Sequence, residues 1–147
     1  MNDGTAPMQM LEDLLLAGRP GDYICLLALD SLEHLVIAGG ESAVRRMQGQ
    51  VLAMLNAACG PGQVVPRGRS GQFLIPLRGL SETACRQKVA QLLAAVPGCR
   101  LQDAGGSLGV SARAGTVPLA MVSPRSMERL IQMAEAAIKH DGLSGIG

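Results

Sequence analysis

Residues 67–77 read Arg-Gly-Arg-Ser-Gly-Gln-Phe-Leu-Ile-Pro-Leu, and this stretch decides the fold. Apolar residues lead into it at Val64-Val65 and leave it over Phe73–Leu77, which predicts a β-hairpin with its tip at Arg69–Phe73. A glycine-containing turn lets bare backbone approach a nucleotide phosphate closely. Metal-dependent phosphoryl chemistry also needs at least one carboxylate, and this turn has none. We therefore interpret the hairpin as a phosphate-type site that lacks its acidic group.

The pattern of apolar residues predicts helices and strands on both sides of this hairpin. Spacings of three and four residues predict helices over 8–17, 44–55, 84–96 and 127–138. Continuous or alternating apolar runs predict strands over Tyr23–Leu29, Cys99–Leu101 and Ser107–Ala112, with a short extension over Pro118–Val122. Ser81 is expected to cap the third helix, and Ser123 with Pro124 to begin the last one. The order predicts an α/β fold, a central, mostly antiparallel sheet flanked by helices.

Composition limits the class of function. The length of 147 residues and the 48% apolar content suit one domain with one core. A net charge of +1 gives no positive electrostatic field strong enough to attract nucleic acid. Tyr23 and Phe73 are the only aromatic side chains that could stack on bases. We therefore expect no nucleic-acid partner.

The cysteines and the amino terminus indicate the compartment. The four cysteines are far apart in the sequence and only His34 and His140 accompany them, which argues against a zinc site. Cys25 and Cys85 fall within apolar patterns and are expected in the core. The amino terminus has no basic segment of a signal peptide, and the longest apolar run, Ile24–Leu29, is too short to cross a bilayer. We expect a reduced, cytoplasmic protein without a cofactor and without membrane insertion.

Four stretches, in order and spacing, resemble one known family: residues 25–35, 67–77, Ser107–Ser111 and Met127–Ile138. From about Leu11 to His140 the chain is similar to a GGDEF domain, the diguanylate cyclase fold. The resemblance implies a nucleotidyl-cyclase-like fold with a ferredoxin-like core. It also implies an N-terminal arm and short linking helix over residues 1–20, followed by a degenerate GGDEF domain over residues 21–147.

The resemblance places the five signature positions at Arg69, Ser70, Gly71, Gln72 and Phe73. In active members the third position is acidic and binds magnesium, together with the first aspartate of an Asp-x-Asp pair.

In this chain those two metal positions are Gly71 and Ala28, and Asp30 matches the second aspartate. Val36 stands where the family has an asparagine for guanine, and Glu41 matches a second guanine-binding acid. The inhibitory cyclic di-GMP site, Arg-x-x-Asp in the family, corresponds to residues 60–63, Gly-Pro-Gly-Gln. The resemblance therefore implies no catalytic residues and no metal site.

Two interpretations remain open for each of three side chains, Asp30, Arg67 and Arg69. Asp30 is either a residual metal ligand or a carboxylate in solvent, and one carboxylate alone does not hold a divalent ion. Arg67 and Arg69 form either a phosphate clamp or a solvated hairpin tip.

The function that the resemblance implies is a catalytically inactive regulatory or protein-interaction module in cyclic di-GMP signalling. The expected partner is an EAL or GGDEF domain, or a component of a secretion, motility or exopolysaccharide apparatus, and a homodimer is an option. The alternative is a non-catalytic receptor for GTP or cyclic di-GMP, contacted weakly through Arg67, Arg69, Asp30 and Glu41.

Overall fold

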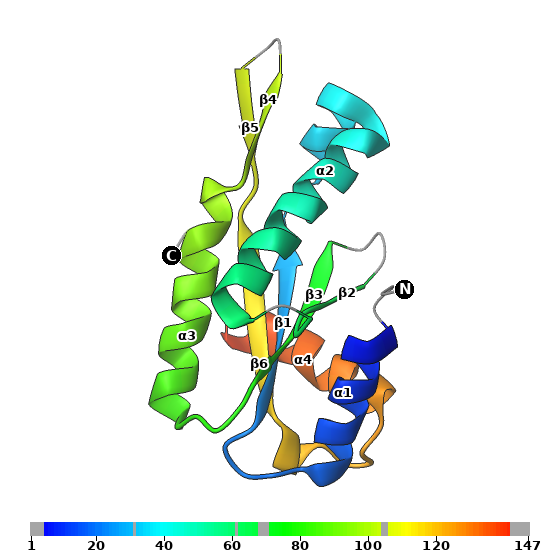
Figure 1. The fold of residues 1–147 in the computed structure, drawn as a ribbon, viewed down its shortest axis with the longest axis vertical. Helices are drawn as coiled ribbons and strands as arrows, with labels where there is room; N and C mark the ends of the chain where they lie inside the picture. Colours follow the sequence, from blue (N-terminus) through cyan, green and yellow to red (C-terminus); the bar gives the residue numbers. More distant parts are fainter. Residues whose placement is uncertain (1–4, 31, 61, 68–70, 104–105, 142–147) are drawn as a thin grey trace.

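The computed structural model describes residues 5–30, 32–60, 62–67, 71–103 and 106–141. It confirms the predicted α/β class, with helices packed around a central sheet (Figure 1). The elements in chain order are α1 (Thr5–Ala17), β1 (Tyr23–Leu29), α2 (Glu33–Cys59), β2 (Val65–Pro66), β3 (Gln72–Leu77), α3 (Glu82–Ala95), the 3-10 turn η2 (Val96–Gly98), β4 (Arg100–Asp103), β5 (Gly106–Gly109), β6 (Ala112–Pro118), the 3-10 turn η3 (Leu119–Met121) and α4 (Met127–Asp141).

The central sheet has four strands in the order β2-β3-β1-β6, and each of these pairings is antiparallel. Strand β1 lies in the middle: Tyr23 pairs with Leu77 of β3 and with Pro118 of β6. Strand β2 is a short edge strand that contains Pro66, which has no amide hydrogen to donate and is therefore tolerated at an edge. Strands β4 and β5 form a separate hairpin.

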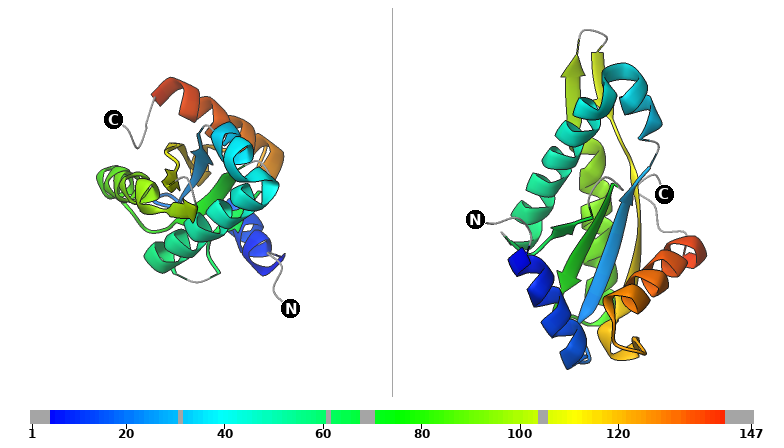
Figure 2. Two further views of the ribbon diagram at one scale, coloured as in Figure 1. Left: turned by 90° about the horizontal axis from the view of Figure 1, so that it is seen from above. Right: turned by 90° about the vertical axis from the view of Figure 1, so that its right-hand side faces the viewer.

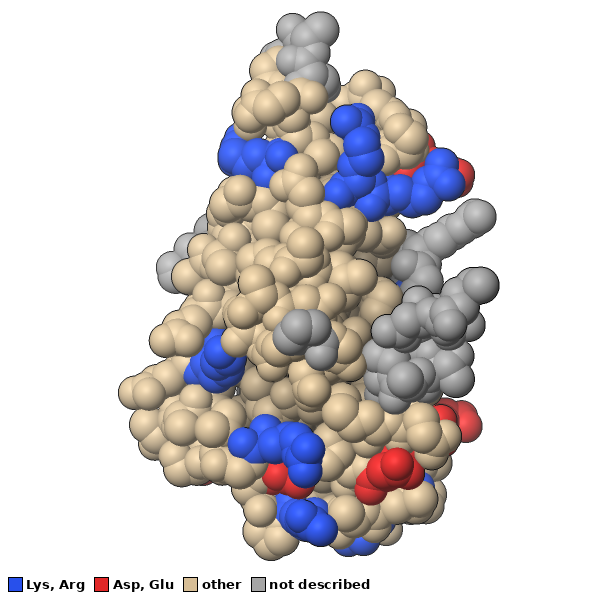
Figure 3. All heavy atoms as spheres, in the orientation of Figure 1, with Lys and Arg blue, Asp and Glu red and all other residues tan. Residues whose placement is uncertain are grey.

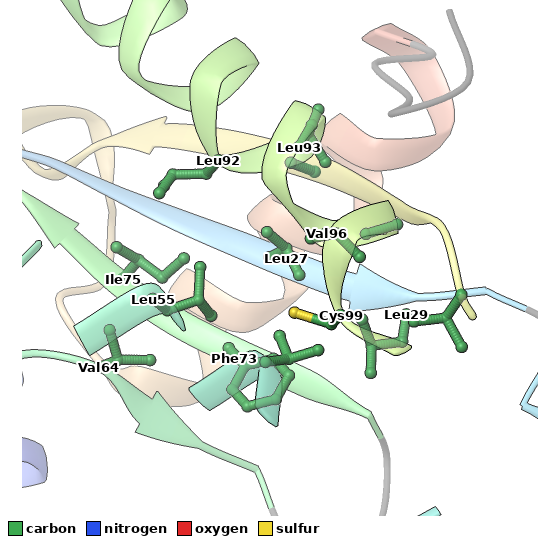
Figure 4. Packing of buried hydrophobic residues seen from close by; sticks show 14 of the residues in the cluster. Leu27, Leu29, Leu55, Val64, Phe73, Ile75, Leu92, Leu93, Val96 and Cys99 are labelled. Atoms are coloured by element: carbon green, nitrogen blue, oxygen red, sulfur yellow. The ribbon is translucent and has the colours of Figure 1, made fainter. Parts of the chain in front are cut away.

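Helices cover both faces of the sheet (Figure 2). Successive side chains of a strand point to opposite faces. Cys25, Leu27 and Leu29 of β1 therefore pack with α2 and α3, and Figure 4 shows Leu27 beside Val96 and Leu29 beside Cys99. The side chains between them, Ile24 and Leu26, pack with α1 and α4. The continuous apolar run of β1 therefore belongs to a strand that is buried on both faces, as predicted.

The expected core cysteines are confirmed. Cys25 is fully buried and Cys85 is 2% exposed, and all four cysteines are free. Burial raises the pKa of Cys25, and burial also raises that of Cys85 against the opposing effect of Arg86. Both side chains therefore remain neutral thiols and serve as small apolar residues.

The strands between residues 106 and 118 differ from the prediction. Residues 107–112 were expected to form one strand, but β5 ends at Gly109 and a new strand, β6, runs over Ala112–Pro118 beside β1. The extension expected over 118–122 contains the turn η3 instead. Strand β6 was not predicted from the sequence because Ala112, Ala114 and Gly115 have low strand propensity.

Three helix starts also differ. Helix α2 begins at Glu33, well before the predicted range 44–55, because the apolar spacing does not extend across the bend at Gly40. Helix α1 begins at Thr5, three residues before the expected start at Met8. The last helix begins at Met127 and not at Pro124, because the Ser126 hydroxyl, rather than that of Ser123, accepts a hydrogen bond from the Arg129 amide at 3.1 Å. The Ser81 cap on α3 is confirmed, with its Oγ accepting from the Ala84 amide at 3.1 Å.

Gly115 explains why β6 needs small residues. A Cβ atom at this position would lie 2.6 Å from the Ala134 carbonyl oxygen and 2.7 Å from the Ile138 amide nitrogen, both in the backbone of α4. Backbone atoms cannot rotate away as the end of a side chain can. The glycine therefore allows α4 to lie directly on the sheet, with Ala134 fully buried at the contact.

We predict that Gly115→Ala lowers the free energy of unfolding by about 1–3 kcal/mol, because it overpacks the contact between β6 and α4. Urea unfolding followed by circular dichroism measures the change. The matched control is Gly49→Ala in α2, where a Cβ meets no atom within 4 Å. This control should be stabilised by about 0.5–1 kcal/mol, because alanine favours a helix interior. Equal stability of Gly115→Ala and the wild type would contradict the assigned contact.

Candidate functional site

The predicted signature turn lies between β2 and β3, and part of it is described. Arg69 and Ser70 lie outside the described residues. Gly71 is buried with φ of 70°, in the left-handed region, and its carbonyl accepts a hydrogen bond from the Leu29 amide at 2.9 Å. Phe73, the last signature position, is 1% exposed and belongs to the core beside α2. Phe73 therefore supports the hairpin from inside and does not face a ligand.

Arg67 is held against the turn. Its amide donates to the Gln72 carbonyl oxygen at 2.9 Å, and its guanidinium donates to the Gln72 side-chain oxygen Oε1. Both the backbone and the side chain of Arg67 therefore bridge the base of the hairpin. Arg67 is intermediate in exposure, and its side chain is held at the base of the hairpin.

The first metal position implied by the resemblance lies at the end of β1. Ala28 is opposite Gln72 of β3 and opposite Arg113 of β6. Residues directly opposite in antiparallel strands share a face, so a methyl group stands between an amide and a guanidinium. The second position, Gly71, has no side chain. Neither position offers a side-chain oxygen ligand.

Asp30 has a protein cation as its partner. Its Oδ1 accepts from Arg113 Nε at 2.7 Å, and its Oδ2 accepts from Ser111 Oγ at 3.4 Å. The Asp30 side chain is 19% exposed and that of Arg113 is 51% exposed. The expected carboxylate in solvent is therefore wrong: β6 brings a fixed positive charge to Asp30.

These residues do not fit a divalent cation. Magnesium needs an octahedron of oxygen ligands and usually one or two carboxylates. Ala28 and Gly71 provide none, and Asp30 is paired with a guanidinium. No group of three or more acidic, histidine or cysteine side chains is placed to hold a metal ion anywhere in the described ranges.

Glu41 and Val36 come together elsewhere, at a bend in α2. Gly40 has non-helical angles, φ of 70° and ψ of −165°, and divides α2 into two segments. A cavity of about 230 Å³ lies at this bend. Its lining residues all come from α2 or from the residue before it: Leu32, Val36, Glu41, Val44, Arg45 and Gln48.

Leu32 connects this cavity with the signature turn. A Cβ atom at Gly71 would lie 2.7 Å from Leu32 Cδ1. The glycine of the turn therefore leaves room for a side chain that lines the cavity on α2.

The region that corresponds to the family's inhibitory site borders another cavity. Gln63 lines a cavity of about 450 Å³ together with Arg78, Lys88 and Cys59. The Lys88 ammonium donates to the Ala58 carbonyl at 2.9 Å, at the last turn of α2. Pro61 lies outside the described residues.

Sequence reasoning missed Arg113, Ser111 and Gln48. Arg113 lies among small residues in a strand that the pattern did not reveal. Its relation to Ala28 and Asp30 follows only from the pairing of β6 with β1. No local signal in the sequence marks it.

The fold is found among solved structures. The GGDEF domain of FimX from Pseudomonas aeruginosa superposes with a TM-score of 0.70 at 18% identity, over 89% of this chain and 87% of that one. The chain has the fold of GGDEF domains. A GGDEF-fold protein from Caulobacter crescentus, DgcB in complex with c-di-GMP, gives a TM-score of 0.72 at 11% identity, over 92% of this chain and 73% of that one.

A third structure extends the comparison to a complex. The diguanylate cyclase SiaD with its activator SiaC, from Pseudomonas aeruginosa, gives a TM-score of 0.74 at 15% identity, covering 92% of this chain and 55% of SiaD. No family model and no curated protein matches the sequence. At these identities the similarity establishes the GGDEF fold, and the resemblance in fold is confirmed.

Within the part of the chain that the structure describes, no helix combines the length and the apolar character needed to cross a bilayer.

We predict that Gly71→Ala and Gly62→Ala each lower the free energy of unfolding by about 1–2 kcal/mol, because both glycines have positive φ. Only Gly71→Ala should also displace Leu32, since a Cβ at Gly62 meets no atom within 4 Å. Methyl NMR spectra measure this: the Leu32 resonances should move in Gly71→Ala and stay in Gly62→Ala. Unchanged Leu32 resonances in both variants would contradict the contact.

Proposed function

We propose that this GGDEF-fold domain is catalytically inactive and acts as a regulatory or protein-interaction module in cyclic di-GMP signalling. The observation that carries the proposal is the pairing of Asp30 with Arg113 beside Ala28. Where the resemblance implies two metal-binding carboxylates, the chain has a methyl group, a glycine and a guanidinium. Arg113 therefore adds positive charge at the end of β1, where a metal site needs negative charge.

A guanidinium does not replace a metal ion in this reaction. It can neutralise a phosphate, but it does not coordinate the attacking hydroxyl and so does not activate it as a nucleophile. The chain's own residues can still position an anion or a partner at this edge. They do not provide the ligands through which two metal ions would assist phosphodiester formation.

The structural comparisons support a signalling context by similarity of fold alone. The SiaD structure is a complex with an activator protein, and a structural neighbour from M. capsulatus is described as an EAL/GGDEF domain protein. A fold hosts several functions, so these relations are analogies. We propose a partner of the same kinds: an EAL or GGDEF domain, a second copy of the chain, or part of a secretion, motility or exopolysaccharide apparatus, in the cytoplasm.

We predict that the purified protein forms no cyclic di-GMP from GTP and magnesium, because no pair of carboxylates is available to hold the ions. Chromatography of the nucleotides measures the product, and an active diguanylate cyclase assayed in parallel is the positive control. Product formation that is lost in Asp30→Ala would overturn the proposal, since it would show that Asp30 works from its position beside Arg113.

The second candidate function is a receptor for GTP or cyclic di-GMP. The cavity at the bend of α2 favours it, because Val36 and Glu41 correspond to the guanine-contacting positions of the family and do lie together. Arg67 keeps a cation at the base of the turn.

We predict that neither nucleotide binds measurably, because Val36 offers no amide to a guanine base and Arg67 is engaged with Gln72. Isothermal titration calorimetry and thermal shift measure binding of each nucleotide. Heat from either one, lost in Glu41→Ala and retained in the matched variant Glu82→Ala on α3, would favour the receptor over the interaction module.

A further inference from the structure

The bend in α2 creates an exposed apolar surface beside a cavity. We call it the elbow surface and define it by the residues Leu32, Val36, Ile37, Glu41, Val44, Arg45 and Gln48. Ile37 is 86% exposed and Val36 is 48% exposed, and both lie in the short segment of α2 before Gly40. In Figure 1 this segment lies at the upper end of α2, at the opposite end of the molecule from α1.

The exposed segment is held in a fixed position. His34 Nε2 donates to the Gly109 carbonyl oxygen at 2.9 Å and so ties the first turn of α2 to β5. Leu35, on the opposite side of the same turn, is fully buried in the core. Val36 and Ile37 are therefore presented to solvent by an anchored helical turn.

A buried amide adds a polar feature to the elbow surface. Gln48 lines the cavity, and its Nε2 atom is buried with no hydrogen-bond acceptor among the residues that the structure describes. Gln48 also lines a neighbouring cavity of about 100 Å³ beside Pro66 and Phe73. A buried donor without an acceptor costs free energy, so this amide locally destabilises the wall of the cavity.

The charge around the elbow surface is mainly positive. Arg45, Arg46 and Arg100 are exposed, and Figure 3 shows basic side chains across the part of the molecule where α2 lies beside the β4–β5 hairpin. Arg100 is close to α2 because its backbone amide donates to the Gln50 side chain at 3.1 Å and its carbonyl accepts from that side chain at 2.8 Å. Arg46 precedes Gln50 by one helical turn, on the same face.

Acidic groups offset only part of this charge. Glu41 lies one turn before Arg45 and faces the same cavity, and Glu33 is exposed one turn before Ile37. The ion pairs found among the described residues join Arg86 with Glu82 and Arg113 with Asp30, and neither involves Arg45, Arg46 or Arg100. Arg45 and Arg46 thus keep their charge available to an acidic partner, whereas the Arg100 guanidinium donates to the hydroxyl and carbonyl oxygens of Ser107.

We propose that the elbow surface binds a protein partner through a short acidic segment with one aliphatic anchor side chain. The anchor enters the cavity between Leu32, Val36 and Val44, and Ile37 packs beside it. The acidic side chains lie against Arg45, which lines the cavity, and against Arg46 beside it on α2. This inference rests on the proposed interaction function and names the chemistry of the partner.

The size of the cavity favours a side chain over a nucleotide. Pockets that bury a drug-sized ligand measure roughly 300–1,000 Å³. The cavity of about 230 Å³ lies below that range, and three of its six lining residues are aliphatic. A cavity of this kind suits one apolar side chain, with specificity provided by charges around it.

Titration of the isotope-labelled protein with synthetic peptides tests the proposal. The main probe has one leucine between two pairs of glutamates, the second has alanine in place of leucine, and the third has lysines in place of the glutamates. The main probe should shift the methyl resonances of Leu32, Val36, Val44 and Ile37. The alanine probe should bind about tenfold more weakly or less, because it loses the anchor, and the lysine probe should not bind.

Matched variants show whether binding occurs at the elbow surface. Val36→Asp should weaken binding of the leucine probe by about tenfold or more, because it places a like charge at the anchor site. Leu16→Asp is the control, since Leu16 is 65% exposed on α1 and the substitution changes the net charge equally. Both side chains are exposed, so both variants should fold, which circular dichroism checks.

Each outcome decides the inference. Equal affinity of the leucine and alanine probes, shifts confined to residues outside the elbow surface, or equal weakening by Val36→Asp and Leu16→Asp would each overturn it. Shifts of the same methyl groups by GTP or cyclic di-GMP, with none from the leucine probe, would also overturn it. The inactivity of the domain is measured separately by cyclic di-GMP formation, so failure of the docking inference leaves that proposal standing.

Discussion

Strand β1 hydrogen-bonds to β3 on one side and to β6 on the other, while helices cover both of its faces. This double burial is the constraint on which the other parts depend. Cys25, Leu27 and Leu29 face α2 and α3, and Ile24 and Leu26 face α1 and α4. A shift of one residue in either pairing would exchange the two faces, so the register is strongly specified. The same register places Ala28 and Asp30 at the edge where β1 leaves the core.

The chemistry of that edge follows from its neighbours. Strand β6 must be built from small residues near Gly115, because α4 lies directly on it. Two residues before Gly115 in β6, Arg113 reaches Asp30. The pair joins a half-exposed and a largely buried side chain, and such pairs stabilise a fold only modestly, by up to about 1 kcal/mol. Its larger consequence is electrostatic: a protein cation lies opposite Ala28 and beside Asp30. The bend of α2 and its arginines are the surface features on which the proposed contact with a partner rests.

Patterns of apolar residues predicted the elements that are long or continuous. The run Tyr23–Leu29 and the spacing in α2, α3 and α4 were informative because burial selects apolar side chains at those positions. Strand β6 was missed because close packing against α4 requires alanine and glycine there, and those residues carry no strand signal. The start of α4 was misplaced because Ser123-Pro124 and Ser126 are both plausible starts, and only the Ser126 hydroxyl reaches an amide of the helix.

The sequence alone determined the α/β class, the hairpin and the absence of a carboxylate at Gly71 and Ala28, because these depend on residue type and local spacing. Only the tertiary structure decided that Arg113 pairs with Asp30, that Phe73 lies in the core and that Leu32, Val36 and Gln48 surround a cavity. Those relations join positions far apart in the chain, or depend on the bend at Gly40. They arise from strand register and helix packing, which the order of residues does not display locally.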